Sequence, residues 1–210
     1  MATVNLLPNG DVSNDWTLST GSDVYALLDD DSVGFHSMDA SKLTASSVGR
    51  ECIVDLQDFT ESHSSIDGVQ IVARAACGRG RTFNLLSDIR NNAIPITIYY
   101  SENSSLQAAS ATYRTITYTN RTTYDGSNAW TNAQLNNLRL RFEVDTLSGG
   151  TLSFTYCYAI VTYTEPVVTD NANRNGLYYT NYTGTSRDPY LDYELAAVAT
   201  DNAIFFGTNF

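Results

Sequence analysis

The stretch Tyr124–Tyr163, YDGSNAWTNAQLNNLRLRFEVDTLSGGTLSFTYCYAIVTY, decides the fold class of this chain. Apolar and charged residues alternate from Leu138 to Asp145, and this period of two predicts a half-buried strand. A second strand is expected over residues 151–164, which are dense in β-branched and aromatic side chains. Residues 147–150, Leu-Ser-Gly-Gly, supply a turn between them. The pattern predicts an antiparallel hairpin of two long strands at the centre of a β-sandwich.

A short helical turn is expected just before the first of these strands, over residues 131–137. Thr131 and Gln134 have the spacing of a capping box, in which each side chain satisfies a backbone N–H group near the other residue. Trp130 precedes the turn, and we expect its indole to plug the core and not to serve as a sugar platform. The residues of this region to which we assign structural roles in the core are Trp130, Thr131, Gln134, Leu140 and Phe142.

The rest of the chain alternates short apolar-patterned runs with Gly, Asn and Asp turns, which is typical of strands in an all-β protein. Two further inward faces are expected, at Cys52, Val54 and Leu56 and at Val69, Ile71, Ala73 and Ala75. Nothing repeats at a fixed period, which excludes solenoids and propellers. The predicted fold class is therefore all-β, an antiparallel β-sandwich or jelly roll with one short helical turn and a C-terminal extension.

The sequence around Pro166 marks an expected domain edge. We assign residues 1–165 to the sandwich, with residues 1–30 either part of it or an N-terminal arm or anchoring segment. Residues 166–210 form a C-terminal extension, of added strands or an interaction arm. Large apolar side chains crowd its end, and because apolar surface in water is unfavourable we expect them to be covered, by a partner subunit in preference to this chain's own sandwich. These residues are Ile204, Phe205, Phe206 and Phe210.

Charge and composition exclude several classes of partner. The 210 residues carry a net charge of −11, with a single lysine, Lys42, among 12 basic residues, whereas nucleic-acid binding needs clustered Lys and Arg. No run approaches the ~20 apolar residues of a membrane span. The N-terminus lacks the pattern of a secretory signal, so we expect synthesis in a cytoplasm. No nucleic-acid or membrane partner is predicted.

The sequence singles out no catalytic, metal or cofactor site. The motifs of phosphate-binding loops, dinucleotide folds, nucleophile elbows and zinc proteases are absent. His36 and His63 stand apart from each other. Cys52 and Cys157 fall on apolar faces of predicted strands and are expected to be buried free thiols. The run Asp29-Asp30-Asp31 is interpreted as a solvated loop in preference to a calcium site, since it lacks the alternate spacing of an EF-hand.

One candidate contact site lies at a glycine-laced tip, Gly78-Arg79-Gly80-Arg81. Two guanidinium groups at the end of a hairpin would suit an acidic partner, although such a tip is more often solvated. Arg79 and Arg81 are therefore candidate interface residues.

Several motifs resemble the β-sandwich module common in virion proteins of tailed bacteriophages, over residues 20–165. They are Asn128-Ala129-Trp130-Thr131-x-x-x-Leu135, Tyr156–Tyr163, the strand pattern at 66–75 and the acidic loop at 29–31. Separately, Asp188–Tyr193 looks like the closing strand of carbohydrate-binding and surface-adhesion jelly rolls. That segment follows the expected end of the module, which is why residues 166–210 are treated as an addition.

The resemblance implies a structural or host-contact role and supplies no catalytic residues. On this basis we expect a non-enzymatic phage virion protein, in the first place a capsid decoration or cement subunit. Its partners would then be the major capsid protein or neighbouring subunits, with a homo-oligomer expected and no cofactor. The alternative is a fibre or tail adhesin that binds host-surface glycans through exposed Tyr and Trp. A glycoside-active enzyme is a third, minor reading.

Overall fold

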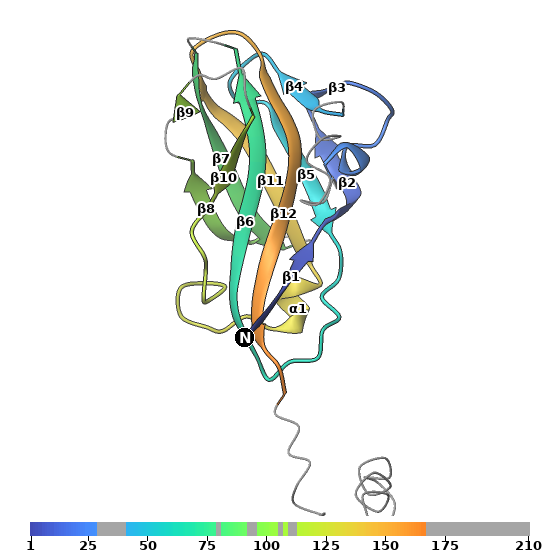
Figure 1. Cartoon of the computed structure of the whole chain (residues 1–210), viewed down its shortest axis with the longest axis vertical. Helices are drawn as coiled ribbons and strands as arrows, with labels where there is room; N and C mark the ends of the chain where they lie inside the picture. Colours follow the sequence, from blue (N-terminus) through green and yellow to red (C-terminus); the bar gives the residue numbers. More distant parts are fainter. Residues whose placement is uncertain (29–40, 79–80, 92–95, 105–106, 109–112, 167–210) are drawn as a thin grey trace, which may run out of the picture. The chain divides into compact units, whose positions relative to one another are not determined.

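The computed structural model describes residues 1–28, 41–78, 81–91, 96–104, 107–108 and 113–166. Within these ranges the chain is almost entirely β-strand, and the strands form two antiparallel sheets that lie face to face (Figure 1). The all-β sandwich predicted from the sequence is confirmed. The two short helices are η1 (Tyr25–Leu27) and α1 (Asn132–Leu135).

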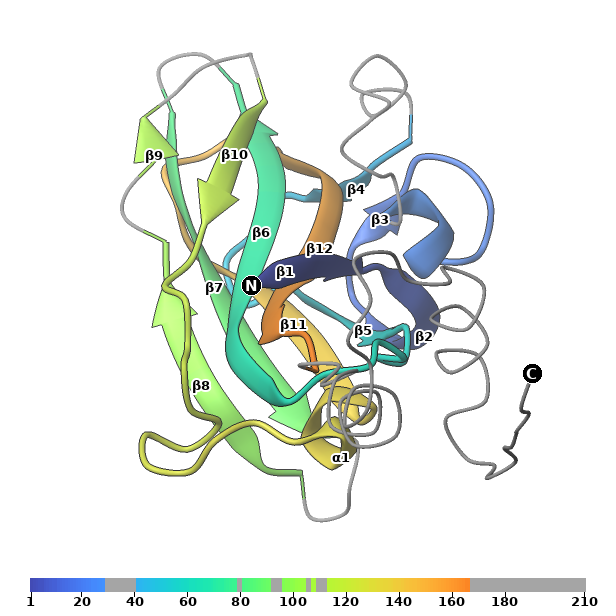
Figure 2. The ribbon, with the colours of Figure 1, turned by 60° about the horizontal axis from the view of Figure 1, so that its bottom comes forward.

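Each sheet has six strands, and neighbours in the order below are hydrogen-bonded. Sheet A runs β10 (Arg114–Thr117), β6 (Ser65–Cys77), β12 (Leu152–Thr164), β4 (Leu43–Ala45), β3 (Thr17–Leu18), and β1 (Ala2–Leu6) also pairs with β12. Sheet B runs β2 (Pro8–Asn14), β5 (Glu51–Leu56), β11 (Leu138–Leu147), β7 (Thr82–Asn91), β8 (Ile98–Asn103), and β9 (Gln107–Ala108) also pairs with β7. Figure 2 shows the same two layers from a second direction.

The predicted hairpin of the two long strands is wrong. β11 pairs with β5 and β7 in sheet B, whereas β12 pairs with β6, β4 and β1 in sheet A. The turn between them crosses from one sheet to the other, and Gly149 and Gly150 adopt φ of +109° and +80° there, which favours glycine. An alternation with a period of two identifies which side chains of a strand point inward, but it does not identify the strand with which that strand pairs. The segment between β6 and β7 also joins the two sheets, so the glycine-laced tip is not a hairpin either.

The core lies between the sheets and is filled by the inward faces that the alternation predicted. Leu140, Phe142 and Val144 of β11 have no exposed surface. The ring of Phe142 meets that of Phe154 on β12, with 4.9 Å between centroids. Trp16, which stands among polar residues in the sequence, is only 4 % exposed, and its ring lies 5.6 Å from that of Phe154. Burial of these rings provides much of the driving force that holds the sheets together.

The end of the sandwich near α1 is closed by a cluster of aromatic rings. Trp130 is 3 % exposed, and its indole N–H donates to the backbone oxygen of Arg121 at 2.7 Å. The rings of Tyr99 and Tyr124 pack edge-on or tilted against it. The backbone N–H of Thr131 donates to Oε1 of Gln134 at 3.0 Å and starts α1 as a capping box.

Residues 1–28 are built into the sandwich. β1 pairs with β12 from Ala2↔Tyr163 to Leu6↔Ala159, and β2 pairs with β5. The first segment thus contributes strands to both sheets and does not form a separate arm. Residues 1–165 form one compact unit. The role expected for residues 166–210 lies outside the described residues and stays a prediction.

The three cysteines, Cys52, Cys77 and Cys157, are buried free thiols, as expected for the first and last of them. Burial raises the pKa of all three thiols, which keeps them protonated at neutral pH. They behave as small core hydrophobes.

Candidate functional site

The candidate site lies on the outer face of sheet A, the side turned away from the core. Because side chains alternate along a strand, the outward positions of four neighbouring strands form rows across this face. Cross-strand pairing places Ser153 of β12 beside Ala76 of β6 and Thr44 of β4. Tyr113 immediately precedes β10 at one end of the row, and Lys42 immediately precedes β4 at the other.

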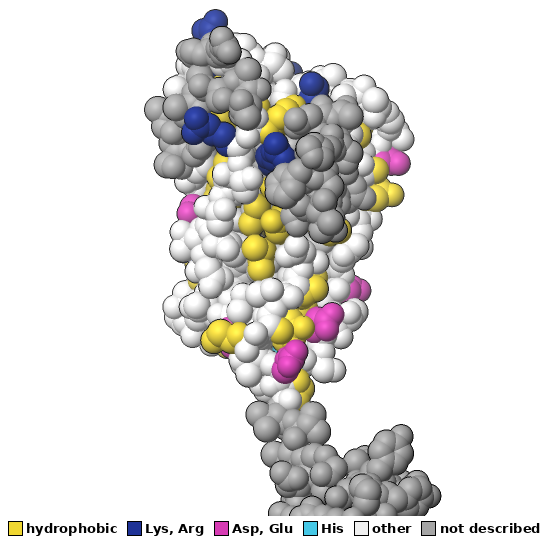
Figure 3. Space-filling view, viewed as in Figure 1, with side chains coloured by type: hydrophobic (Ala, Val, Ile, Leu, Met, Phe, Trp, Pro, Cys, Tyr) yellow, Lys and Arg dark blue, Asp and Glu magenta, His cyan; other side chains and the backbone are white. Residues whose placement is uncertain are grey.

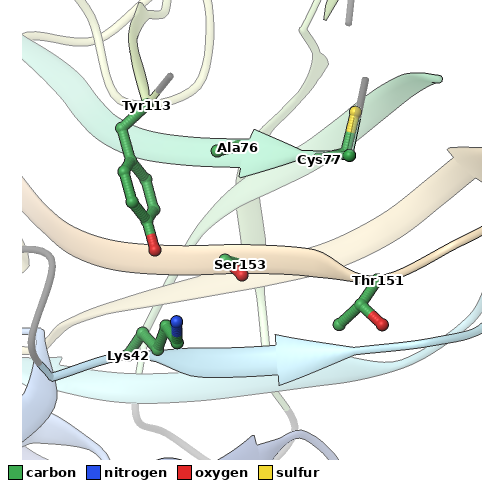
Figure 4. A pocket seen from close by; sticks show the side chains of 7 residues that line it. Lys42, Ala76, Cys77, Tyr113, Thr151 and Ser153 are labelled. Carbon is green, nitrogen blue, oxygen red and sulfur yellow. The ribbon is translucent and has the colours of Figure 1, made fainter. Parts of the chain in front are cut away.

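This row forms a depression of about 280 Å³. Its floor is low because β6 and β12 present small side chains there, and its two sides rise because Tyr113 and Lys42 are long. Figure 4 shows the Tyr113 hydroxyl and the Lys42 ammonium group extending toward β12 from opposite sides, with the Ser153 hydroxyl between them. The volume lies just below the roughly 300–1,000 Å³ of most small-molecule pockets. The residues that line it are Lys42, Ala76, Cys77, Gly78, Tyr113, Thr151 and Ser153.

Three polar side chains of this depression, those of Lys42, Thr151 and Ser153, have no partner among the described residues. The side chains of Lys42, Thr151 and Ser153 make no hydrogen bond or ion pair within the part of the chain that the structure describes. Lys42 is fixed through its backbone instead: its N–H donates to Oγ of Ser19 at 2.9 Å, and its carbonyl accepts from the Ser19 N–H at 2.9 Å. Three polar groups are therefore presented from strands without being occupied by their neighbours.

Tyr113 is oriented by a cation–π contact. The guanidinium carbon of Arg74, an outward residue of β6, lies 5.6 Å from the centre of its ring. Tyr113 is half-buried and lines the depression. The aromatic wall of the site is thus held in place by Arg74.

An apolar strip continues from the depression along β6 and β12, in the middle of the face seen in Figure 3. Tyr156 and Tyr158 stack there with 5.7 Å between centroids and an interplanar angle of 20°. They are 2 % and 8 % exposed, so their rings are not available as a ligand platform. The hydroxyls of Tyr156 and Thr115 lie 3.3 Å apart and tie the strip to β10.

The outer face of sheet B is polar in a different way, since its charges neutralise one another. Arg139 pairs with Asp55 at 2.6 Å, and Arg141 reaches Asp88 at 3.0 Å as well as Glu51 and Glu143. Burial alone would raise the pKa of the Asp88 carboxyl. The hydrogen bonds and guanidinium groups around it lower the pKa by a larger amount, so the pKa lies below its usual range. These ion pairs form a structural network in which each of these arginines already has a carboxylate partner.

Of the residues predicted to contact a partner, the structure describes only Arg81. Its Nη1 donates to the backbone oxygen of Ser148 at 3.1 Å, so it braces the turn between β11 and β12. Arg79, Ile204, Phe205, Phe206 and Phe210 lie outside the described residues, as do His36 and the aspartates at 29–31. The structure places the five residues with assigned core roles around α1 and β11, as described above.

The sequence analysis missed the depression itself. Tyr113 and Lys42 lie far apart in the chain, and neither belongs to a local motif. The one available signal was Lys42, the single lysine of an acidic chain, placed directly before an apolar strand. The strand order needed to bring it opposite Tyr113 cannot be read from alternation.

The described residues offer little for catalysis or metal binding. No carboxylate or imidazole lines the depression. His63 is exposed, with Nδ1 2.9 Å from the backbone oxygen of Glu61. Among the residues that the structure describes, no group of three or more His, Cys, Asp or Glu side chains could hold a metal ion. In the same residues no helix has the length and apolar character to cross a membrane.

The sequence matches no protein-family model, and no curated protein shows significant similarity to it. Solved structures with a related arrangement of strands were found. One is a truncated AlyQ with CBM32 and alginate lyase domains, at 18 % identity and a TM-score of 0.41, covering 79 % of this chain and 35 % of that one. This chain therefore spans about a third of that protein.

Two others are isolated modules. The CBM36-1 domain of a multidomain xylanase from the hindgut metagenome of Trinervitermes trinervoides has 7 % identity and a TM-score of 0.40, covering 79 % of this chain and 100 % of that one. The xylan-binding module CBM15 has 12 % identity and a TM-score of 0.38, covering 79 % and 99 %. Likeness at this level carries no argument about ligand or function, and the fold assignment rests on the sheets described above.

Proposed function

We propose that the β-sandwich is a non-catalytic carbohydrate-binding domain and that its ligand occupies the depression between Tyr113 and Lys42. One observation carries this proposal: a half-buried aromatic ring lines a depression together with three polar side chains that have no partner among the described residues, over a floor of small residues. A sugar ring offers an apolar C–H face together with hydroxyl groups that both donate and accept hydrogen bonds. An aromatic ring suits the first, and the hydroxyls of Thr151 and Ser153 suit the second.

This proposal corresponds to the alternative reading of the sequence, in which the protein binds glycans. Tyrosine-rich surfaces also occur at protein interfaces, but such surfaces are broad, with a well-packed centre. Here the accessible aromatic group is a single ring at the side of a small polar hollow, because the tyrosine pair on β12 is buried. A capsid decoration role, homo-oligomerisation and a place in a virion stay predictions, as does the absence of enzymatic activity.

The test is retention by polysaccharides in native affinity gels, with a panel of neutral and acidic glycans. The Tyr113→Ala variant should bind roughly tenfold more weakly, since loss of one ring contact costs on the order of 1.4 kcal/mol, whereas Tyr113→Phe should keep most of the affinity. Tyr100→Ala is the matched control. Tyr100 is also half-buried and also faces a guanidinium group, that of Arg121 at 4.5 Å, but it lies on β8 of sheet B.

Retention that survives in Tyr113→Ala, or that falls equally in Tyr100→Ala, would place the glycan elsewhere on the sandwich. Failure of every glycan in the panel to retain the unmodified protein would refute carbohydrate binding by this domain.

A further inference from the structure

The charge of the depression specifies its ligand further than its shape does. The chain carries a net charge of −11, yet among the described residues no carboxylate lines this site, and the one charged side chain of that lining is Lys42. Four arginines among the described residues, Arg90, Arg121, Arg139 and Arg141, are each neutralised by a carboxylate within 3.0 Å. Lys42 has no such partner in the described part of the chain.

We infer that the depression binds an acidic saccharide, with one singly charged group, the carboxylate of a uronic acid or a sulfate ester, placed against Lys42. This inference rests on the proposed function and names the class of sugar. An ammonium group with no counter-ion among the described residues gains from a ligand that brings one, because charge-assisted hydrogen bonds are stronger than neutral ones. Its three N–H donors and the hydroxyls of Thr151 and Ser153 match the acceptor-only character of such a group.

The distribution of charged side chains over this face also favours an anionic ligand at the depression. In Figure 3 the Lys and Arg side chains visible on this face lie in its upper part, whereas Asp and Glu show toward its lower end and also at both side edges. Arg74, behind Tyr113, adds a second positive group near the depression. At the other end, Glu61 lies near Tyr163. An anionic sugar is thus attracted to the end that holds the depression and repelled from the opposite one.

The number of charges on the anionic group distinguishes carboxylated and sulfated saccharides from phosphorylated ones. A phosphate monoester carries about −1.5 to −2 charges at neutral pH. Within the part of the chain that the structure describes, the depression has one lining cation, Lys42, and the guanidinium group of Arg74 lies against the Tyr113 ring. One positive charge matches a carboxylate or a sulfate ester.

Matched pairs of polymers test the inference in native affinity gels. Polygalacturonate and polyglucuronate are each compared with their carboxyl-reduced forms, and a sulfated galactan is compared with its desulfated form. We expect the unmodified protein to bind at least one charged polymer at least fivefold more tightly than its neutral partner. Because the whole protein is acidic, non-specific ion exchange would give the opposite order. The pair that shows the preference identifies the anionic group.

Variants of Lys42 test whether its ammonium group recognises the anionic group of the polymer. Lys42→Gln should abolish the preference, so that the charged polymer and its neutral partner bind with similar affinity, and Lys42→Arg should retain it. Arg139→Gln removes the same charge from the outer face of sheet B and should leave the preference intact. Thermal melting of each variant checks that it is folded.

Two outcomes would overturn the inference. If the neutral polymers bind as tightly as the charged ones, or if Lys42→Gln keeps the preference, then Lys42 does not recognise an anionic group of the ligand. When this result comes with binding that still depends on Tyr113, the proposed function stands without the charge specificity. If no polymer is retained at all, both the inference and the proposed function fail.

Discussion

The rings of Phe142 and Phe154 lie 4.9 Å apart across the core, although they sit on consecutive strands that do not pair with each other. β11 and β12 each occupy a central position in a different sheet, and these two rings are where the strands meet. The contact joins the two layers directly, and its loss should affect the whole sandwich.

We expect Phe142→Ala and Phe154→Ala each to lower the free energy of unfolding by about 3–5 kcal/mol, because both rings are fully buried. The double variant should lose less than the sum, since the two residues share one contact. Urea denaturation measures all three values. Ile98→Ala is the control, because Ile98 is 51 % exposed and its truncation should change stability little. Strict additivity would mean that the rings do not interact across the core.

The indole of Trp130 should contribute through both packing and its hydrogen bond. We expect Trp130→Ala to cost about 3–5 kcal/mol and Trp130→Phe, which keeps an aromatic ring but loses the bond to the Arg121 oxygen, to cost about 1–2 kcal/mol. Iodide should quench the tryptophan fluorescence of the folded protein poorly, because Trp16 and Trp130 are both buried. A Trp130→Ala protein of unchanged stability, or free quenching, contradicts this placement.

Acid should weaken the network of ion pairs on sheet B through Asp88. Its pKa in the folded protein lies below its ordinary value of about 3.9, so its ionised form stabilises the fold above that pH. This contribution is lost as the pH falls through the lowered pKa. Asp88→Asn should therefore cost about 1–3 kcal/mol at pH 7, with the difference from the unmodified protein shrinking below about pH 4.

Denaturation curves at pH 7 and pH 3 provide this comparison, and Asp58→Asn, at an exposed position between β5 and β6, controls for the loss of one charge. If Asp88→Asn lowers the free energy of unfolding equally at both pH values, then Asp88 does not contribute to the acid sensitivity of the fold.

Removal of residues 166–210 tests the predicted domain division. The described core is built from residues before Pro166, so a chain that ends at Glu165 should keep its melting temperature within a few degrees. We expect the deletion to weaken self-association, measured by light scattering, because it removes the apolar residues Ile204, Phe205, Phe206 and Phe210. Unfolding of the shortened chain at room temperature would show that the extension completes the sandwich.

The sequence predicted the faces of the strands better than their neighbours. The alternation at residues 138–145 identified Leu140 and Phe142 as inward, because side-chain direction depends only on a local period. The pairing of β12 with β1 and β6 depends on residues far away in the chain, and no local pattern encodes it. Trp16 was missed for a related reason, since its polar neighbours in sequence are not its neighbours in space.

The candidate site was harder to predict from the sequence than the fold. Tyr113, Ser153 and Lys42 come together only because β10, β6, β12 and β4 follow one another in sheet A. Each residue alone is an ordinary surface position. The proposed glycan-binding class had been the alternative implied by the resemblance to virion modules, but the location of the candidate site required the strand order.

The position of β12 also governs how the protein can be made. It is the strand that links β10 and β6 to β4, β3 and β1, and its residue Tyr163 pairs with Ala2, which precedes it by almost the whole length of the sandwich in the sequence. At about 5–20 residues per second, β1 leaves the ribosome on the order of ten seconds before Tyr163 is added. Sheet A cannot close during that interval, and its apolar inner faces stay available to other chains. Products that terminate before β12 are therefore expected to aggregate or be degraded.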